Sequence, residues 1–306
     1  MENEELQQPT FFHKPVLVHE VIEYLNIQPG KLYLDATFGS GGHTRAILEA
    51  DPTCRVLALE WDVVSLDTYA PLLQKDFGDR FGCVFGSFAH LYKILKKEKI
   101  ARVDGILADF GTSQMQIVER PGFSVHRDRA LDMRMSPQHY KTTAADIVNH
   151  ASEQELREIF WRYGEEKYTK EIARAIVQER AKKKIYTTKE LVAVIDRVVP
   201  AAAKRHKIHP ATRVFQALRI VINQELDNIR AFLPVALNSL APDGHMVCIS
   251  FHSLEDRLVK DFFREQAEAG KAQLLTKKAV GPSPEELEAN PASRSAKLRA
   301  VRRIDV

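Results

Sequence analysis

Three acidic residues each stand at the end of a short apolar run, at Asp35, Glu60 and Asp109. The runs are typical of buried strands, and parallel strands of a doubly wound sheet present their carboxyl ends to one ligand-binding crevice. We therefore expect the three carboxylates to face the same crevice. At the end of the second strand, a carboxylate such as Glu60 can accept hydrogen bonds from ribose hydroxyls. Acids at strand ends also cap neighbouring helices, which is the structural alternative.

A glycine-rich turn follows the first acid, in the run Asp35-Ala-Thr-Phe-Gly-Ser-Gly-Gly-His43. Glycines let the backbone approach a ligand closely. A dinucleotide fingerprint starting at Gly39 would need Gly or Ala at position 44, which is Thr44. The spacing of Asp35, Gly39 and Gly41 instead favours S-adenosyl-L-methionine, although Thr37 stands where a first glycine is usual. A generic strand-to-helix turn is the alternative.

Other candidate residues lie near the predicted strand ends or in the middle of the chain. Phe88 follows the third run and is expected near an adenine ring, or else in the core. His252 and Ser253 follow the last apolar run and could contact a substrate base. Ser253 lacks the flanking glycines of a nucleophile elbow, so hydrolase chemistry is not expected. Arg134 could bind a phosphate, or pair with Asp132.

The elements that must position these residues are an α/β sheet and a helical insertion. Strands are expected over 32–38, 55–60, 81–86, 104–109 and 245–251, with helical segments between the first four, which predicts parallel strands. The tail predicts an antiparallel pair over 272–278 and 296–304. Residues 117–216 contain no convincing strand. Capping boxes begin helices there at Ser152 and Thr187. A long helical stretch is expected over 213–240.

We therefore expect a Rossmann-like core formed by residues 1–116 and 217–306, with an all-helical domain inserted over 117–216. The 306-residue chain has a net charge of +3, but the insertion carries 20 Lys and Arg against 13 Asp and Glu. The remainder carries 24 basic and 28 acidic residues. The excess of positive charge in the insertion suggests a surface for a polyanion, although a solvated helical face is the common alternative. The densest basic runs comprise Arg180, Lys182, Lys183 and Lys184, and then Lys204, Arg205 and Lys207.

The remaining composition argues against metal, membrane and secretory roles. Cys54, Cys83 and Cys248 lie in apolar runs and are expected to be reduced core thiols. Cys and His residues show no metal-ligand spacing, so no metal is expected. No apolar run approaches the roughly 20 residues that span a bilayer. The acidic start argues against a leader peptide, so a cytoplasmic protein is expected.

Seven ordered motifs resemble those of the ribosomal RNA small-subunit methyltransferase H family, also called MraW. They lie at 35–43, 104–113, 120–124, 131–135, 163–166, 209–219 and 249–257. The resemblance extends over nearly the whole chain. It implies an S-adenosyl-L-methionine-dependent enzyme that methylates N4 of a cytidine in the decoding region of bacterial 16S rRNA. It also implies the small ribosomal subunit as partner, with the insertion recognising RNA.

The resemblance assigns cofactor contacts to Gly41, Gly42, His43, Glu60, Phe88, Asp109 and Gln116. The chain departs from the family at three places. Glu60 stands where the family usually has Asp, and Ser40 where it has Arg. The loop over 110–116 lacks the family's second Ser and its Pro, and Gln116 rather than Gln114 keeps the family's spacing from Asp109.

The expected reaction is methylation of a weakly nucleophilic exocyclic amine, which needs in-line positioning and an acceptor for the amino hydrogens. Asp109 is the best candidate for that acceptor, and His252 is expected to position the base. Two other functions stay open at this point. One is a non-catalytic ribosome assembly factor that binds S-adenosyl-L-methionine, and the other is a DNA or protein methyltransferase on the same fold.

Overall fold

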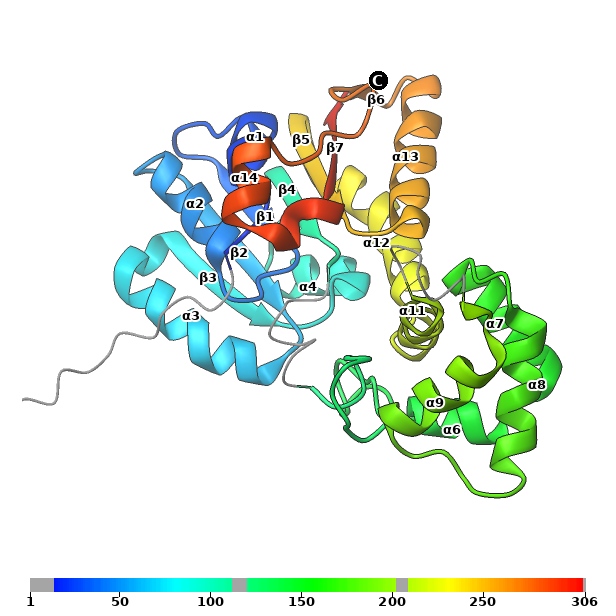
Figure 1. Cartoon of the computed structure of the whole chain (residues 1–306). Coiled ribbons are helices and arrows are strands. Elements are labelled where there is room, and N and C mark those ends of the chain that lie inside the picture. The colour runs from blue at the N-terminus through cyan, green and yellow to red at the C-terminus, as the bar shows by residue number, and fades with distance from the viewer. Residues whose placement is uncertain (1–13, 112–119, 202–208, 305–306) are drawn as a thin grey trace, which may run out of the picture. The chain divides into compact units, whose positions relative to one another are not determined.

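A computed structural model describes residues 14–111, 120–201 and 209–304 of the chain (Figure 1). The chain forms two compact units. The sheet unit comprises residues 1–113 and 227–306, and the helical unit comprises residues 114–226.

The sheet unit is built on a seven-stranded sheet in the order β3-β2-β1-β4-β5-β7-β6. Its parallel part comprises β1 (Leu32–Asp35), β2 (Arg55–Glu60), β3 (Phe81–Phe85), β4 (Val103–Asp109) and β5 (Leu240–Ser250). At the far edge β7 (Lys297–Arg303) runs antiparallel to β5 and to β6 (Ala272–Leu274). The strand order reverses direction between β1 and β4, which is where doubly wound sheets bind ligands. This arrangement confirms the predicted Rossmann-like sheet and its antiparallel tail.

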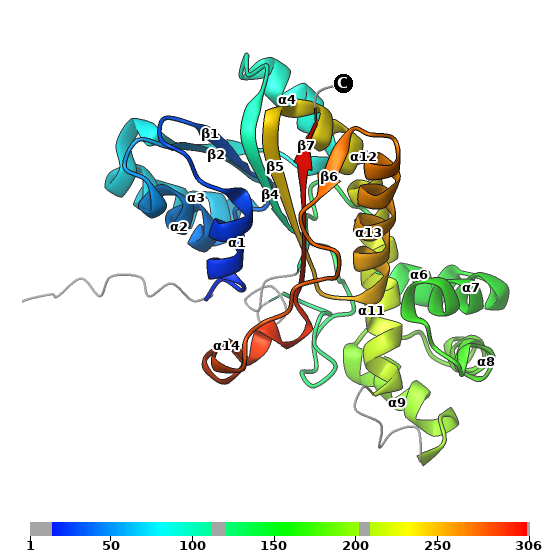
Figure 2. The ribbon, with the colours of Figure 1, turned by 90° about the horizontal axis from the view of Figure 1, so that it is seen from above.

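Helices cover both faces of the sheet (Figure 2). On one face lie α1 (Val18–Leu25), α2 (Gly42–Ala50) and α3 (Val63–Phe77); on the other lie α4 (Leu91–Lys97), α12 (Glu225–Ser239) and α13 (Ser253–Glu268). Burial on both faces explains why the central strands read as near-continuous apolar runs. A further short helix, α14 (Pro284–Ala289), holds the start of α1, because Glu286 Oε1 accepts a hydrogen bond of 2.7 Å from the Leu17 amide.

The helical unit comprises α6 (Ala144–His150), α7 (Glu153–Gly164), α8 (Thr169–Arg180), α9 (Thr188–Val198) and α11 (Pro210–Ile222). The predicted capping boxes form at Ser152 and Thr187, and a third forms at Thr143. The apolar faces of these helices meet in a core of their own, which includes Phe160, Ile176, Leu191, Val214 and Leu218. The unit therefore buries its own apolar side chains.

Two sequence expectations were wrong in detail. The helix expected over 213–240 is two helices, since α11 ends at Ile222 and α12 begins at Glu225. Gln224, with a φ of 50°, turns the chain between them. Residue 216, where the insertion was expected to end, lies inside α11. In the structure the helical unit ends at Leu226. β5 begins at Leu240 rather than at 245, and it accommodates the extra residues by a register shift against β4 between Val103 and Gly105.

Candidate active site at the carboxyl ends of the strands

The glycine turn after β1 has a backbone that only glycine adopts easily. Gly39 and Gly41 have φ values of 57° and 80°. A Cβ at Gly41 would lie 2.9 Å from Phe38 Cε2, and one at Gly42 would lie 2.8 Å from Pro15 Cγ, whereas the space beside Gly39 is open. Gly41 is the N-cap of α2, whose first turn has N–H groups without intrahelical acceptors. The turn therefore brings the N–H groups in the first turn of α2 to the end of β1.

Glu60, at the end of β2, joins that strand to the glycine turn. Its Oε2 accepts a hydrogen bond of 2.8 Å from the Gly39 amide. Its Oε1 accepts bonds of 2.9 Å and 2.7 Å from the amides of Trp61 and Asp62. The residue is 6% exposed, and burial raises the pKa of its carboxyl to about 7. Because a carboxylate has about four acceptor positions, these three bonds leave roughly one for a ligand.

Asp109, at the end of β4, lies next to β1 and α2. Its amide donates a 2.7 Å hydrogen bond to Thr37 Oγ1 just after β1. Its carboxylate oxygen Oδ2 lies 3.9 Å from Nδ1 of His43, and its side chain is 15% exposed. Burial raises the pKa of Asp109 to about 6, and the neighbouring His43 opposes that rise. This carboxyl is mainly ionised at neutral pH but close to the range in which it can exchange a proton.

The His43 ring points into the protein. Its Nε2 donates a 2.8 Å hydrogen bond to the Val16 carbonyl, which can only accept. The ring is buried. His43 therefore connects the segment before α1 with the region of Asp109. Because its ring points inward, only the backbone of His43, in the first turn of α2, continues the glycine turn.

Asp35 adds a third carboxylate, which is fully buried, to this edge of the sheet. It accepts hydrogen bonds of 2.7 Å from Thr44 Oγ1 and 3.0 Å from the Thr37 amide. Burial raises its pKa as well. Two of these acids at neighbouring strand ends, Asp35 and Asp109, have His43 as a common neighbour whose charge opposes the rise in the pKa of each. Electrostatically, the arrangement favours a positively charged ligand, which would offset the cost of burying the carboxylates.

Phe88 packs in an aromatic cluster beside this edge. It lies in a short 3-10 turn, Phe88–His90, and its ring centroid is 5.7 Å from that of Phe110 and 5.3 Å from that of Phe232. Phe232 is fully buried, whereas Phe88 is only partly buried. The ring thus packs against these aromatic residues and keeps some accessible surface.

His252 and Glu255 form a capping pair at the start of α13. His252 Nδ1 accepts a 3.4 Å bond from the Glu255 amide, and its Nε2 lies 3.2 Å from Glu255 Oε1. Glu255 Oε2 accepts bonds of 2.8 Å and 3.3 Å from the amides of Phe251 and His252. Both nitrogens of the histidine therefore face Glu255. A Cβ at Gly111 would overlap the Phe251 ring, so the end of β5 packs closely against the chain after β4.

Sequence reasoning missed Thr37 and Glu255, which hold Asp109 and His252. The signal for Glu255 was present, because an acid three residues after a helix cap is the mark of a capping box. Thr37 gave no such signal, since its bond to Asp109 spans 72 positions. Gln116 lies outside the described residues, as do Lys204, Arg205 and Lys207.

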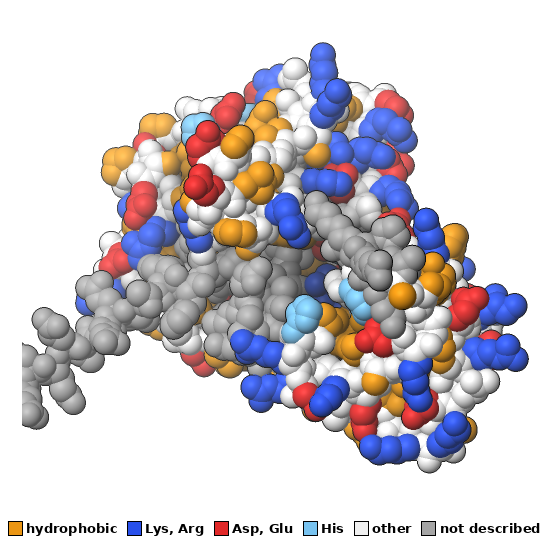
Figure 3. Space-filling view, viewed as in Figure 1, with side chains coloured by type: hydrophobic (Ala, Val, Ile, Leu, Met, Phe, Trp, Pro, Cys, Tyr) orange, Lys and Arg blue, Asp and Glu red, His pale blue; other side chains and the backbone are white. Residues whose placement is uncertain are grey.

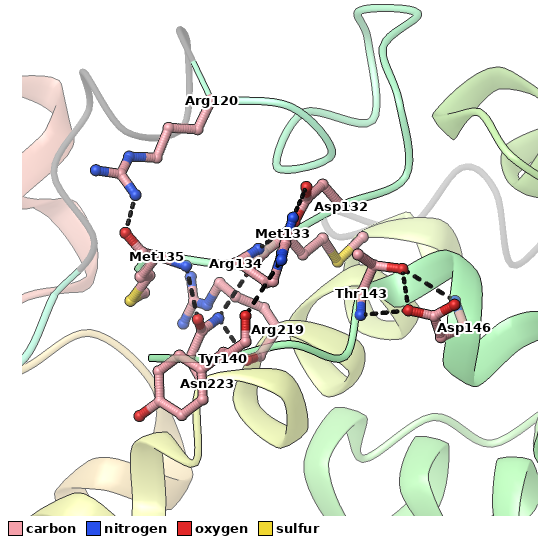
Figure 4. Close-up of polar contacts among 10 residues, drawn as sticks. All are labelled: Arg120, Asp132, Met133, Arg134, Met135, Tyr140, Thr143, Asp146, Arg219 and Asn223. Carbon is pink, nitrogen blue, oxygen red and sulfur yellow. Dashed lines mark hydrogen bonds and ion pairs between the residues drawn. The ribbon is translucent and has the colours of Figure 1, made fainter. Parts of the chain in front are cut away.

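Arg134 of the helical unit pairs with Asp132, as one of its two predicted roles required (Figure 4). Its Nε and Nη2 donate to the two carboxylate oxygens at 2.7 Å and 2.8 Å, and its Nη1 donates to the Tyr140 carbonyl at 3.2 Å. These bonds leave few donors for a phosphate. The motif around Leu131 is therefore a structural turn, in which the buried Met133 has a φ of 65°.

None of the helices within the described ranges is long and apolar enough to cross a membrane. The thiols match their predicted character in part: Cys54 and Cys248 are buried and Cys83 is partly buried, and burial raises the pKa of all three.

Comparison with known proteins identifies the family. The sequence profile of the MraW methylase family matches residues 10–304. A ribosomal RNA small subunit methyltransferase H from Sulfurihydrogenibium sp. is 47% identical over 95% of this chain and 99% of that relative. The protein of the same name from Carboxydothermus hydrogenoformans is 46% identical, over 96% of this chain and 98% of its own length. These matches confirm the predicted family and its cofactor, S-adenosyl-L-methionine. The chain therefore belongs to the MraW methylase family.

Proposed function

We propose that this chain transfers a methyl group from S-adenosyl-L-methionine to N4 of a cytidine in the 16S rRNA of the small ribosomal subunit. The observation that carries the proposal is the partly buried Asp109 carboxylate, at the end of β4 and near His43 in the first turn of α2. The names of the relatives support the substrate, since they are small-subunit rRNA methyltransferases.

The carboxylates and backbone donors at the strand ends suit the charged groups of the cofactor. Backbone N–H groups at Gly42 and His43 would bind the carboxylate of its methionine part, which suits a helix N-terminus. Gly41, whose N–H donates to the Phe38 carbonyl at 2.8 Å, would contribute a close backbone approach. Glu60 would accept a hydrogen bond from the ribose, and the accessible surface of Phe88 would contact the adenine. Gln116 is proposed as a further contact on the resemblance alone.

When bound, S-adenosyl-L-methionine supplies an electrophilic methyl group on a positively charged sulfur. The N4 lone pair of cytosine is conjugated with the ring, so this amine is a poor nucleophile. Asp109 would accept a hydrogen bond from the amino group and would take the proton released as the N–C bond forms and the C–S bond breaks. A pKa of about 6 leaves the carboxylate ionised at neutral pH and able to accept that proton.

Amine methylation is favoured over methylation at carbon 5 of the ring. Carbon-5 chemistry normally needs a cysteine thiolate that adds to the base. Cys54, Cys83 and Cys248 all lie in strands or next to them, and burial raises the pKa of each thiol. The sequence that follows Asp109, from Phe110 to Arg120, contains no cysteine.

Methyl transfer to small subunits that lack the modification tests this proposal. We expect the wild-type protein to transfer the radiolabelled methyl group to 16S rRNA, and Asp109→Asn to turn over at least about 10²-fold more slowly. Cofactor binding, measured by calorimetry, reports whether the variant still folds and binds. Wild-type turnover by Asp109→Asn would refute the role of Asp109. Binding of subunits and cofactor without any turnover by the wild type would instead favour a non-catalytic assembly factor.

A further inference from the structure

Two segments that are far apart in the sequence are held together on the helical unit. The Leu131 amide donates a 2.8 Å hydrogen bond to the Tyr186 carbonyl, and the Thr188 amide donates a 3.0 Å bond to the Arg129 carbonyl. The Thr188 hydroxyl also donates to the Arg127 carbonyl at 2.6 Å. These bonds form a short antiparallel pairing between residues 127–131 and the connection from α8 to α9.

This pairing gathers exposed positive charge. Over 127–129 and 182–190 the chain carries six basic residues, Arg127, Arg129, Lys182, Lys183, Lys184 and Lys189, and two acidic ones, Asp128 and Glu190. All six basic residues are exposed. Figure 3 shows Lys and Arg side chains along the lower edge of this unit, where the α8–α9 connection runs in Figure 1.

Four of these six cations have no ion-pair partner among the residues that the structure describes. Glu190 is already occupied, because it binds Lys183 Nζ at 2.7 Å and accepts from the amides of Tyr186 and Thr187. In contrast, Arg129, Lys182, Lys184 and Lys189 form no ion pair with any residue in the described part of the chain. Arg180 is different from its neighbours in the predicted basic run, since it donates to the Val148 carbonyl at 2.7 Å and so serves the fold.

Tyr186 lies between Lys184 and Lys189 in the chain, and its ring is exposed. Its side chain is 61% exposed, although its amide and its carbonyl are both held, by Glu190 and by the Leu131 amide. A single exposed aromatic residue is ordinary. An exposed ring on a fixed backbone, in a segment rich in exposed cations, is instead the combination that suits single-stranded nucleic acid, with cations for the phosphates and a flat face for a base.

We propose that the basic aromatic surface, defined as Arg127, Arg129, Lys182, Lys184, Tyr186 and Lys189, binds an unpaired stretch of the substrate rRNA, with a base stacked on Tyr186. The proposal rests on the proposed function, because that function makes RNA the polyanion which the helical unit meets. Unpaired RNA is favoured over a duplex, since a duplex buries the faces of its bases. An acidic membrane or protein surface would also accommodate both the cations and the ring. RNA is favoured because the proposed function makes RNA the substrate.

The test measures RNA binding by the full-length protein in the absence of cofactor. The probe is a 5′-fluorescein 12-residue oligouridylate, followed by anisotropy at several salt concentrations. The variants are Tyr186→Leu, Tyr186→Phe and the triple change Lys182→Gln/Lys184→Gln/Lys189→Gln. Two matched controls on the same unit are Trp161→Leu, which removes a 63% exposed aromatic from α7, and Lys170→Gln/Arg174→Gln, which neutralises exposed charges on α8.

We expect Tyr186→Leu to weaken binding at least about fivefold, the weight of one base–aromatic stack, and Tyr186→Phe to bind as the wild type does. The triple variant should flatten the slope of log Kd against log salt by about 2, at roughly 0.7 per lost phosphate contact. Both controls should stay within about twofold of the wild type. Unchanged binding by Tyr186→Leu, or a triple variant no weaker than the α8 control, would overturn the proposal.

Two further outcomes separate this surface from the proposed function. Binding of the wild type to vesicles of phosphatidylcholine and phosphatidylserine through Tyr186, but not to oligouridylate, would assign the surface to a membrane and overturn the proposal. A wild type that binds RNA through this surface, yet transfers no methyl group to rRNA, would support the surface while refuting the proposed function.

Discussion

Glu60 and Asp109 carry different tasks because their carboxylates have different neighbours. The Glu60 carboxylate accepts hydrogen bonds from three backbone amides, one of them in the glycine turn. About one acceptor position is left for a ligand. Asp109 has one long bond, of 3.4 Å from the Gly111 amide, and lies near His43. Asp109, with fewer hydrogen bonds, is the better candidate to accept a proton. Glu60, with more, is the better candidate to bind the ribose.

Replacing Glu60 with Gln should weaken binding of S-adenosyl-L-methionine about tenfold or more, because a charged acceptor is lost. Glu60→Asp, which restores the residue usual in the family, should stay within about threefold. Calorimetric titration of both variants measures the difference. Equal affinities for Glu60→Gln and the wild type would show that the Glu60 carboxylate does not contact the cofactor.

The pKa of Glu60 also predicts how cofactor affinity depends on pH. Burial raises it to about 7, so the carboxyl is protonated in much of the protein at pH 6 and ionised at pH 8. The ionised form is the better acceptor and the better partner for a cation, so affinity should rise from pH 6 to pH 8. Titrations at pH 6, 7 and 8 should show a steeper rise in the wild type than in Glu60→Gln. Parallel profiles would contradict the assignment.

Turnover should depend on the ionisation of Asp109. Burial raises its pKa to about 6, and only the carboxylate can take the amino proton. With cofactor and subunits saturating, the rate should rise through about pH 6 and level off above it. The residual rate of Asp109→Asn should lack this step. The same step in the variant would mean that another group, and not Asp109, is the base.

At the scale of elements, the sequence predicted most strands and helices correctly, and the reasons are local. The strands of the parallel sheet are apolar runs buried on two faces, and the helix starts at Ser152 and Thr187 follow from capping boxes four residues long. The acids at strand ends were placed correctly because strand direction fixes them. These features depend only on neighbours in the sequence.

The failures of prediction depend on contacts between distant residues. The break between α11 and α12 occurs at Asn223, whose buried side chain accepts from the Met135 amide at 2.7 Å and donates to the Met133 carbonyl at 2.8 Å (Figure 4). These partners are 88 and 90 positions away. Periodicity within 213–240 contains no trace of them, so the sequence predicts one continuous helix. The bond between Thr37 and Asp109 was missed for the same reason.

Asn223→Ala should therefore destabilise the helical unit. It leaves the buried Met135 amide and Met133 carbonyl without partners, at about 1–3 kcal/mol for each group. Urea unfolding should show a loss of about 2–4 kcal/mol, compared with less than about 0.5 kcal/mol for Gln178→Ala at an exposed site of α8. Similar losses in the two variants would mean that Asn223 does not hold the Met133 turn.

For the whole molecule, family membership and fold were both predictable, because seven motifs extend along the chain and the α/β pattern surrounds a helical insertion. The helical unit is the part in which sequence charge was least informative. Of its densest described basic run, Arg180 serves the fold and Lys183 pairs with Glu190. Only the structure shows that a backbone pairing joins the segment with Arg127 and Arg129 to the segment with Lys182, Lys184 and Tyr186, some 55 residues further along the chain.

The most direct test of the central claim identifies the methylated nucleoside. Small subunits that lack the modification are incubated with the wild-type protein and S-adenosyl-L-methionine, and the 16S rRNA is digested to nucleosides for mass spectrometry beside N4-methylcytidine and 5-methylcytidine standards. The account predicts N4-methylcytidine, formed by the wild type and nearly lost in Asp109→Asn. A product methylated at carbon 5, or rRNA without any new methyl group, would contradict it.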